Sequence, residues 1–298
     1  MKSIIVRAPL IGRFANIVYR SRLIVPVVAR NMKSSLSWLF ASKETTNFTY
    51  DLTERNIQHL AEFVSQVTGA SNELALRYIR ELQEDEELRK HIANMTAKSA
   101  EAFKSDNEAR YGRRLGWYAV TRIMKPRVVV ETGVEKGLGA VILCAALKRN
   151  SEEGFEGRYY GTDIDTRAGY LLEGDYKKFG TILYGDSIDS ISNLDEMIDL
   201  FITDSDHTPG YEAKEYAVIT PQLSENSTIL SDNAHATDDL LDYSHISGRK
   251  FLFFREDPGE FWYPGGGIGA AFPASRQTQT AETRDEPVAD LKIVNRTA

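Results

Sequence analysis

Apolar residues recur along the chain with two different spacings. Between Thr53 and Gly69 they return every three or four positions, which predicts a helix that begins at Thr53 and ends at Gly69. A second helix is predicted from Ser71, continuing into residues 84–92, whose charges are typical of a solvated face. The predicted inward positions are Ile57, Leu60, Ala61, Val64, Val67, Leu74, Tyr78, Ile79 and Leu82. We expect these helices to form a cap or a dimerisation region.

Beyond Tyr111 the pattern changes to short β-branched runs, most of them separated by helix-sized gaps. The runs are RVVVETG, GRYYGTDID, GTILYGD, DLFITD, STILSDN and KFLFFRE. This alternation predicts an α/β fold, a mostly parallel sheet with helices on both faces. Ligands of such sheets bind at the carboxyl ends of the strands, so candidate functional residues are expected there.

Composition and charge narrow the class of protein. A length of 298 residues suits one elaborated α/β domain with an added helical region. The net charge of −7 argues against a nucleic-acid binder, which normally has a basic surface. Cys144, the single cysteine, excludes an internal disulfide and suits the reducing cytoplasm. Its apolar setting, AVILCAAL, favours core packing over nucleophilic chemistry.

Residues 1–43 are basic and apolar, with eight lysines and arginines and no acid. They are compatible with a helix that packs on the protein or on a second copy in a homodimer, with peripheral membrane contact, or with a targeting peptide. No apolar run approaches the roughly 20 residues that span a bilayer. Pro9 and Pro26 are expected to confine any helix to the stretch between them.

The end of the first predicted strand carries an acid and a glycine-rich turn. VVVETGVEKGLGA places Glu131 before Gly133 and Gly137, and glycines allow the backbone to pass close to a ligand. The spacing differs from the G-x-G-x-x-G fingerprint, which argues against a nicotinamide oxidoreductase. Asp163, at the next strand end, is suited to accept hydrogen bonds from both ribose hydroxyls. At the third strand end, Asp186 and Ser187 can contact an adenine edge.

This ordered set of strand-end residues resembles the cofactor site of class I S-adenosylmethionine-dependent methyltransferases, over roughly residues 110–272. The resemblance implies a Rossmann-like sheet with a seventh, antiparallel strand and S-adenosylmethionine as cofactor. The implied cofactor contacts are Glu131, Thr132, Gly133, Gly137, Asp163, Asp186, Ser187 and Asp204. The predicted regions are 1–50 (basic segment), 51–109 (helical cap), 110–272 (methyltransferase domain) and 273–298 (weakly ordered tail). The alternative is an α/β domain whose glycines and acids serve only as turns and caps.

Two further stretches, DLFITDSDH and TILSDNAH, resemble the metal-dependent O-methyltransferases of the catechol O-methyltransferase type. By position, that resemblance implies Mg²⁺ ligands at Asp204, Asp232 and Asn233. His207 lies where macrolide-sugar O-methyltransferases carry an Asp-x-x-His base, which implies that it removes the acceptor proton. Caps and an Asx turn are the alternative roles for these acids. Asp206 is an alternative ligand or base, and His235 another candidate.

The resulting hypothesis is Mg²⁺-dependent O-methylation of a sugar or glycan-like small molecule, with no nucleic-acid partner. One alternative is metal-independent transfer to an amine or a carboxylate. Another is a non-catalytic S-adenosylmethionine-binding protein that acts as an assembly partner. Residues 261–263, an aromatic triplet before three glycines, predict either a mobile wall over the substrate or a hairpin packed on the sheet.

Overall fold

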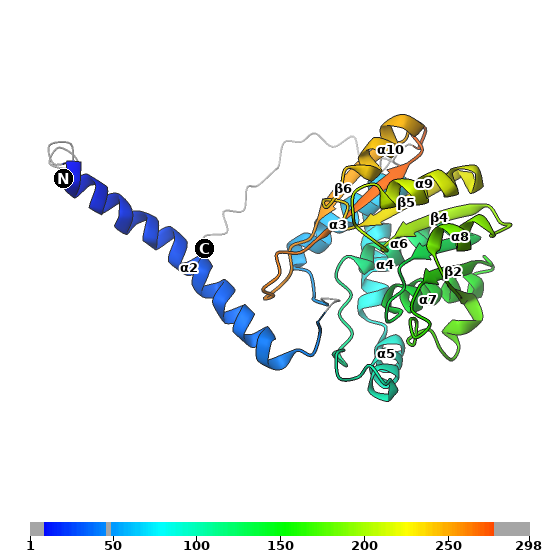
Figure 1. The fold of residues 1–298 in the computed structure, drawn as a ribbon, viewed down its shortest axis with the longest axis horizontal. Coiled ribbons are helices and arrows are strands. Elements are labelled where there is room, and N and C mark those ends of the chain that lie inside the picture. The colour runs from blue at the N-terminus through cyan, green and yellow to red at the C-terminus, as the bar shows by residue number, and fades with distance from the viewer. Residues whose placement is uncertain (1–8, 46–48, 277–298) are drawn as a thin grey trace, which may run out of the picture.

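The computed structural model describes residues 9–45 and 49–276 and contains a seven-stranded sheet in the order β3-β2-β1-β4-β5-β7-β6 (Figure 1). Strands β1 to β5 pair in parallel, whereas β7 runs antiparallel to both of its neighbours, β5 and β6. The strand bounds are β1 Val128–Thr132, β2 Arg158–Asp163, β3 Gly180–Tyr184, β4 Ile198–Thr203, β5 Leu223–Asp232, β6 Lys250–Arg255 and β7 Gly267–Phe272. The predicted Rossmann-like fold, including its antiparallel seventh strand, is confirmed.

Helices cover both faces of the sheet because successive strand residues point to opposite sides. Val129 faces one hydrophobic cluster, and Val128 and Val130 face the other. The first face packs against α3 (Glu54–Thr68), α4 (Asn72–Gln83), α6 (Arg114–Met124) and α7 (Leu138–Glu152). The second packs against α8 (Ser187–Ser192), α9 (Tyr211–Ile219) and α10 (Asp239–Ser247), and the short 3-10 helix η2 (Thr220–Gln222) follows α9. The other 3-10 helix, η1 (Tyr176–Phe179), packs with the first cluster. Cys144 is buried in α7, in agreement with a packing role.

The predicted helix ends near the N-terminus are confirmed, with one correction. Thr53 and Ser71 cap α3 and α4 through their side chains, and Gly69 ends α3 in the left-handed conformation. The second predicted helix is in fact two, because Asp85 accepts a hydrogen bond from the backbone N–H of Leu88 and starts α5 (Glu86–Lys98). Helices α3, α4 and α5 contribute to the same hydrophobic core as α6 and α7.

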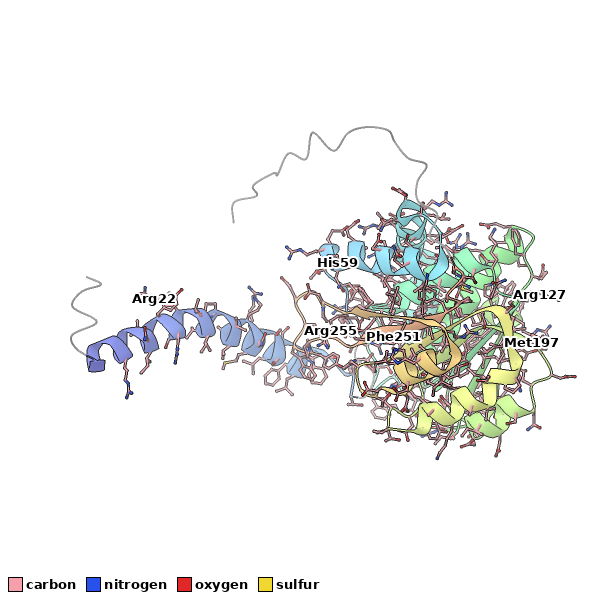
Figure 2. All side chains as sticks on the ribbon, turned by 90° about the horizontal axis from the view of Figure 1, so that it is seen from above. Arg22, His59, Arg127, Met197, Phe251 and Arg255 are labelled. Atoms are coloured by element: carbon pink, nitrogen blue, oxygen red, sulfur yellow. The ribbon has the colours of Figure 1, made fainter. Side chains whose placement is uncertain are left out.

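Helix α2 (Pro9–Ala41) projects away from the rest of the protein (Figures 1 and 2). The prediction that Pro26 ends a helix is wrong, because α2 continues through it. Proline removes one backbone hydrogen bond, and on an exposed helix the freed carbonyl can be hydrated. Within the described residues, no helix has both the length and the apolar content of a membrane span.

The predicted tail lies mostly outside the described residues. Of residues 273–298, only 273–276 belong to the described part. There Arg276 donates hydrogen bonds to the backbone oxygen of Val67 and to Thr228 Oγ1, each at 2.8 Å. The last described turn therefore ties the end of β7 to α3 and β5.

Candidate active site

A cavity of about 580 Å³ opens at the carboxyl ends of β1 to β4. Five of the predicted cofactor contacts line it, namely Gly133, Asp163, Asp186, Ser187 and Asp204. The parallel strands bring these residues together because their carboxyl ends lie on one edge of the sheet. A volume of this size is typical of small-molecule and cofactor sites.

The turn after β1 forms one wall of this first cavity. Gly133 has φ +79°, and a Cβ atom there would overlap the backbone carbonyl of Asp204, so the position requires glycine. Asp163, at the end of β2, holds this turn through hydrogen bonds to the backbone. Its two carboxylate oxygens accept hydrogen bonds from the backbone N–H groups of Glu135 and Asp165, each at 2.8 Å. The acid is thus held at the cavity edge, with lone pairs left for a ligand.

The far end of the first cavity is built on the N-terminus of α8. Asp186 caps this helix by accepting hydrogen bonds from the backbone N–H groups of Ile188 and Asp189. Ser187 donates a 2.6 Å hydrogen bond to Glu215, a carboxylate that is fully buried behind the wall. Glu215 also accepts hydrogen bonds from Thr132, Thr203 and Ser205, and thereby joins β1, β4 and the loop after β4.

Glu131, Thr132 and Gly137 do not line the first cavity. The Glu131 side chain is fully buried and receives a 2.5 Å hydrogen bond from the Tyr159 hydroxyl. Burial raises the pKa of Glu131 from 4.5 to about 8, and the nearby Asp204 adds to the effect. A Cβ atom at Gly139 would overlap its carboxylate, which therefore packs against the start of α7. Gly137 precedes α7 in the left-handed conformation. Their predicted cofactor contact thus receives no support from the geometry.

A second cavity, of about 330 Å³, adjoins the first. The two share four lining residues, Gly133, Glu135, Asp204 and Ser205. The second cavity is also lined by Tyr50, Arg113, Arg114, Val134, His207, Asp232, Asn233 and Tyr263. Asp204 therefore lies at the junction, with access to a ligand in either space.

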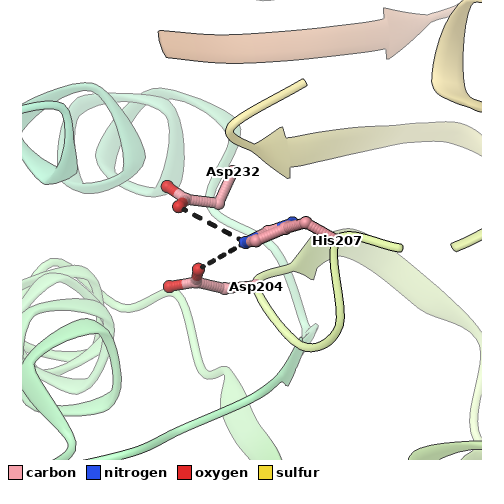
Figure 3. A group of neighbouring side chains, drawn as sticks. All are labelled: Asp204, His207 and Asp232. Atoms are coloured by element: carbon pink, nitrogen blue, oxygen red, sulfur yellow. Dashed lines mark ion pairs between the residues drawn. The ribbon is translucent and has the colours of Figure 1, made fainter. Parts of the chain in front are cut away.

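Asp204, His207 and Asp232 come together as the sequence predicts (Figure 3). His207 Nε2 lies 3.6 Å from Asp204 Oδ1 and 4.0 Å from Asp232 Oδ2, while its Nδ1 lies 3.1 Å from Glu212. Burial alone would lower the pKa of His207, but the contacts with Asp204 and Glu212 outweigh it and raise the pKa to about 10. His207 is therefore a cation at neutral pH, and in this state it cannot act as the predicted base.

The acids of this cluster have different proton affinities. Burial, together with the negative charge of Asp232, raises the pKa of Asp204 to about 7. The pKa of Asp232 is lowered instead, since the contact with Arg113 outweighs its burial. Asp204 is thus the carboxylate whose ionisation changes near neutral pH, and Asp232 remains an anion.

Two arginines that sequence reasoning missed neutralise these acids. The Arg113 guanidinium donates to both oxygens of Asp232, through Nε to Oδ1 and through Nη2 to Oδ2 at 2.5 Å. Arg114 Nη2 lies 3.3 Å from Asp204 Oδ2. The network continues to Glu256, which accepts hydrogen bonds from the Arg113 backbone N–H at 2.8 Å and from the Tyr50 hydroxyl at 2.7 Å. Adjacent arginines at the start of an otherwise apolar helix, RRLGWYAV, were the available signal.

The predicted metal ligands only partly form a ligand set. Asp204, His207 and Asp232 offer donor atoms within 4.8 Å of one another. Asn233 instead donates its amide N–H to Asp232 Oδ2 at 2.7 Å, and Arg113 already occupies both oxygens of Asp232. Arg113 thus competes with a divalent cation for Asp232, and the predicted Mg²⁺ ligand set is formed only in part.

The remaining candidates lie at the margins. Asp206 is exposed, lines the first cavity and accepts a hydrogen bond from the backbone N–H of Thr208. His235 is exposed and lines neither of the two cavities. Of the aromatic triplet, Tyr263 lines the second cavity. Phe261 packs on Tyr50 and Trp262 on Trp38, with ring centroids 5.1 Å apart in each pair.

Comparison with known proteins agrees with this architecture. Residues 130–234 match the family model of a methyltransferase domain. A protein from Klebsiella pneumoniae described as an O-methyltransferase superposes with a TM-score of 0.50 at 11% identity, covering 65% of this chain and 93% of its own. At this identity the likeness shows the fold alone.

Two other solved structures resemble the chain. The O-methyltransferase from Bacillus cereus in complex with S-adenosylhomocysteine has a TM-score of 0.49 at 13% identity, covering 66% of this chain and 96% of its own. TomG from Streptomyces achromogenes, an O-methyltransferase of tomaymycin synthesis, has a TM-score of 0.47 at 15% identity, covering 64% and 90%. No curated protein matches the sequence significantly.

Residues 130–234 therefore have the sequence pattern of a methyltransferase domain. The predicted resemblance to methyltransferases is confirmed over these residues, and the predicted fold is confirmed over the whole sheet.

Proposed function

We propose that this protein is an S-adenosylmethionine-dependent O-methyltransferase that acts on a hydroxyl of a sugar or glycan-like small molecule. The observation that carries the proposal is the pair of adjoining cavities with Asp204 at their junction. A methyl donor in the first cavity and an acceptor in the second would meet at that junction, and such positioning accounts for much of the acceleration in bound-cofactor transfer.

The first cavity suits the parts of the cofactor in the order of the strands. The narrow turn at Gly133 would accommodate the methionine portion, and Asp163 would accept hydrogen bonds from the ribose hydroxyls. Asp186 and Ser187 lie where the adenine edge would be held. The support for this choice of cofactor is the order of these residues along the sheet edge and the size of the cavity that they line.

The second cavity suits a hydroxylated acceptor. Its lining combines charged groups with two tyrosines, Tyr50 and Tyr263, whose rings lie 6.3 Å apart. Aromatic rings stack on the apolar faces of sugars, and carboxylates accept hydrogen bonds from hydroxyl groups. This combination supports a polyhydroxylated ring over a purely apolar acceptor.

Asp204 replaces His207 as the proposed proton acceptor. It lies in both cavities, whereas His207 is held as a cation between Asp204 and Glu212. A general base is most effective when its pKa is near the working pH, as for Asp204. His207 would then hold Asp204 in place and limit its basicity.

The positive charges beside the acceptor cavity favour methyl transfer without a divalent cation. The predicted Mg²⁺ would supply positive charge next to the acceptor oxygen, but Arg113 and Arg114 already provide two fixed positive charges beside Asp232 and Asp204. The Mg²⁺ requirement remains a prediction that can be tested directly.

The first experiment is calorimetric titration with S-adenosylhomocysteine, with and without Mg²⁺, of the wild-type protein and of Asp163→Ala. We expect micromolar binding that is independent of Mg²⁺ and at least tenfold weaker in the variant, because Asp163 is the ribose acceptor. No binding in any condition would refute the cofactor assignment. Binding without methyl transfer to any hydroxylated sugar in an acceptor screen would favour a non-catalytic binding protein.

The second experiment tests the cation directly. Wild-type protein and Arg113→Ala are titrated with Mg²⁺ by calorimetry after treatment with EDTA. We expect no binding below millimolar concentrations in the wild type, because the Arg113 guanidinium occupies Asp232. Tight binding to the wild type that is lost in Asp232→Asn would restore the metal-dependent mechanism and overturn this part of the proposal.

A further inference from the structure

Helix α2 carries an apolar stripe along one side that is exposed to solvent. At 100° per residue, its members fall within an arc of about 120°. They are Ile17, Val18, Ile24, Val25, Val28, Met32, Leu36 and Leu39, each of them 39–61% exposed. The helix projects away from the protein, so no other part of the described chain, residues 49–276, covers the stripe (Figures 1 and 2).

The basic residues of α2 lie outside the stripe. Lys33 and Arg22 flank one edge of it, Arg20 flanks the other, and Arg30 lies opposite; Figure 2 labels Arg22 on the projecting helix. Arg13 is the fifth basic residue of the helix, which contains no acid. The opposite side combines these basic residues and several serines and asparagines with Tyr19, Leu23, Val27 and Trp38.

The charge of α2 contrasts with that of the rest of the protein. Residues 1–43 carry eight positive charges and no negative one, and the whole chain carries −7, so residues 44–298 carry −15. An anionic surface would attract the helix and repel the methyltransferase domain. The helix alone would then make the contact and hold the acidic domain away from the surface.

We propose that α2 is an amphipathic anchor that binds the surface of a bilayer containing anionic lipids. An apolar stripe flanked by lysines and arginines is suited to lie in the interface, with the apolar side chains inserted and the cations among the headgroups. Pairing with a second copy of α2 is less favourable, because the stripes would meet with like charges at their edges and no acid to offset them.

The base of the anchor adjoins the second cavity. Trp38, near the end of α2, packs on Trp262, and Tyr263, the next residue, lines that cavity. Ser42 and the backbone N–H of Lys43 also bond to Asp106, at 2.7 and 2.8 Å. The base of α2 is thus fixed to the loop that contributes Tyr263 to the second cavity.

The test is co-sedimentation of the full chain with vesicles of phosphatidylcholine alone or with about 30% phosphatidylserine, a composition chosen as roughly that of an anionic leaflet. We expect binding to the anionic vesicles that weakens with added salt and is much weaker on the neutral ones. Arg20→Gln, Arg22→Gln and Lys33→Gln combined should weaken binding roughly 100-fold, since each basic residue near the surface strengthens it about fivefold.

A matched pair of variants separates the stripe from the opposite side. Ile24→Ser with Val28→Ser removes two stripe residues, and Leu23→Ser with Val27→Ser removes two apolar residues from the other side, at the same spacing around Pro26. The first pair should weaken vesicle binding about 100-fold, whereas the second should keep most of it. Equal losses in both pairs, or wild-type binding in the first, would overturn the proposal.

Sedimentation velocity without lipid tests the alternative that a second copy of the chain covers the stripe. We expect a monomer for the wild type and for both pairs, with the same thermal unfolding midpoint, because α2 lies outside the core. A wild-type dimer that becomes monomeric only in the stripe variant would assign the stripe to a second copy instead. Neither readout depends on cofactor binding or methyl transfer, so failure of the anchor would leave the proposed enzymatic function untouched.

Discussion

Replacing Glu131 by Gln should remove a large pH dependence from the stability of the protein. The side chain is fully buried, one carboxylate oxygen accepts from Tyr159 at 2.5 Å, and the other has no hydrogen-bond partner among the described residues. Its pKa is about 8 in the folded state and about 4.5 in the unfolded chain. The folded protein therefore binds more protons between these values, and its stability falls as the pH rises from 4.5 through 8.

The size of the effect follows from linkage. Each pH unit within this window costs about 1.4 kcal/mol, so between about pH 6 and pH 9 the wild type should lose about 2.5 kcal/mol of unfolding free energy through Glu131. The Glu131→Gln variant keeps a neutral side chain of the same shape and should lose none of this amount. Contributions from other titrating groups cancel in the difference between the two proteins.

Urea unfolding at pH 6, 7, 8 and 9, followed by tryptophan fluorescence, measures that difference. Parallel profiles for the two proteins would refute a buried, protonated Glu131. The same variant decides between a structural and a cofactor-binding role. Calorimetry with S-adenosylhomocysteine should give affinities within about twofold of each other, because the side chain lies outside the cavity. A tenfold loss would return Glu131 to the cofactor site, as the resemblance implied.

Three further predictions concern the two cavities and their supports. Asp204→Asn should lower the rate of methyl transfer by about 10²- to 10⁴-fold with cofactor affinity retained. Asp195→Asn, at an exposed acid that lines neither cavity, should be near wild type. Because the base must be ionised, the wild-type rate should rise with pH through about 7 and level off above it; a rate that falls over this range would exclude Asp204. Gly133→Ala should abolish detectable S-adenosylhomocysteine binding in calorimetry, because the φ of +79° disfavours alanine and the Asp204 carbonyl leaves no room for a methyl group. Near-normal affinity would contradict this geometry of the turn. Glu215→Ala should lower unfolding free energy by about 3 kcal/mol in urea titrations, because it leaves three buried hydroxyls and the half-buried hydroxyl of Ser205 without their acceptor. A loss below about 1 kcal/mol would argue against that network.

The sequence by itself determined the fold class and the edge of the sheet that holds the site. Apolar runs of strand length, separated by helix-sized gaps, leave few arrangements other than parallel strands covered on both faces. Once the strands are parallel, Asp163, Asp186, Asp204 and Asp232 must lie on the same edge, because each follows or ends a strand. The ends of α3 at Thr53 and Gly69 could also be predicted, because helix capping depends on the side chain or the backbone of the capping residue itself.

Which way Glu131 faces was decided only by the tertiary structure. A strand residue can point to either side, and the sequence did not indicate which side of β1 would meet the cavity. In the fold, Glu131 points toward α7 and Tyr159. Packing therefore decided which groups surround Glu131, and those groups and its burial decide whether its carboxyl group is protonated.

The charge state of the acid cluster was also a tertiary outcome. The sequence neighbours of His207 predicted a base, but Asp204, Glu212 and Asp232 surround it in space and make it a cation. Arg113, which occupies Asp232, is 119 residues away along the chain. Electrostatic interactions depend on distance in space and on burial, neither of which a linear pattern records, and so strand-end residues were predictable while their protonation and partners were not.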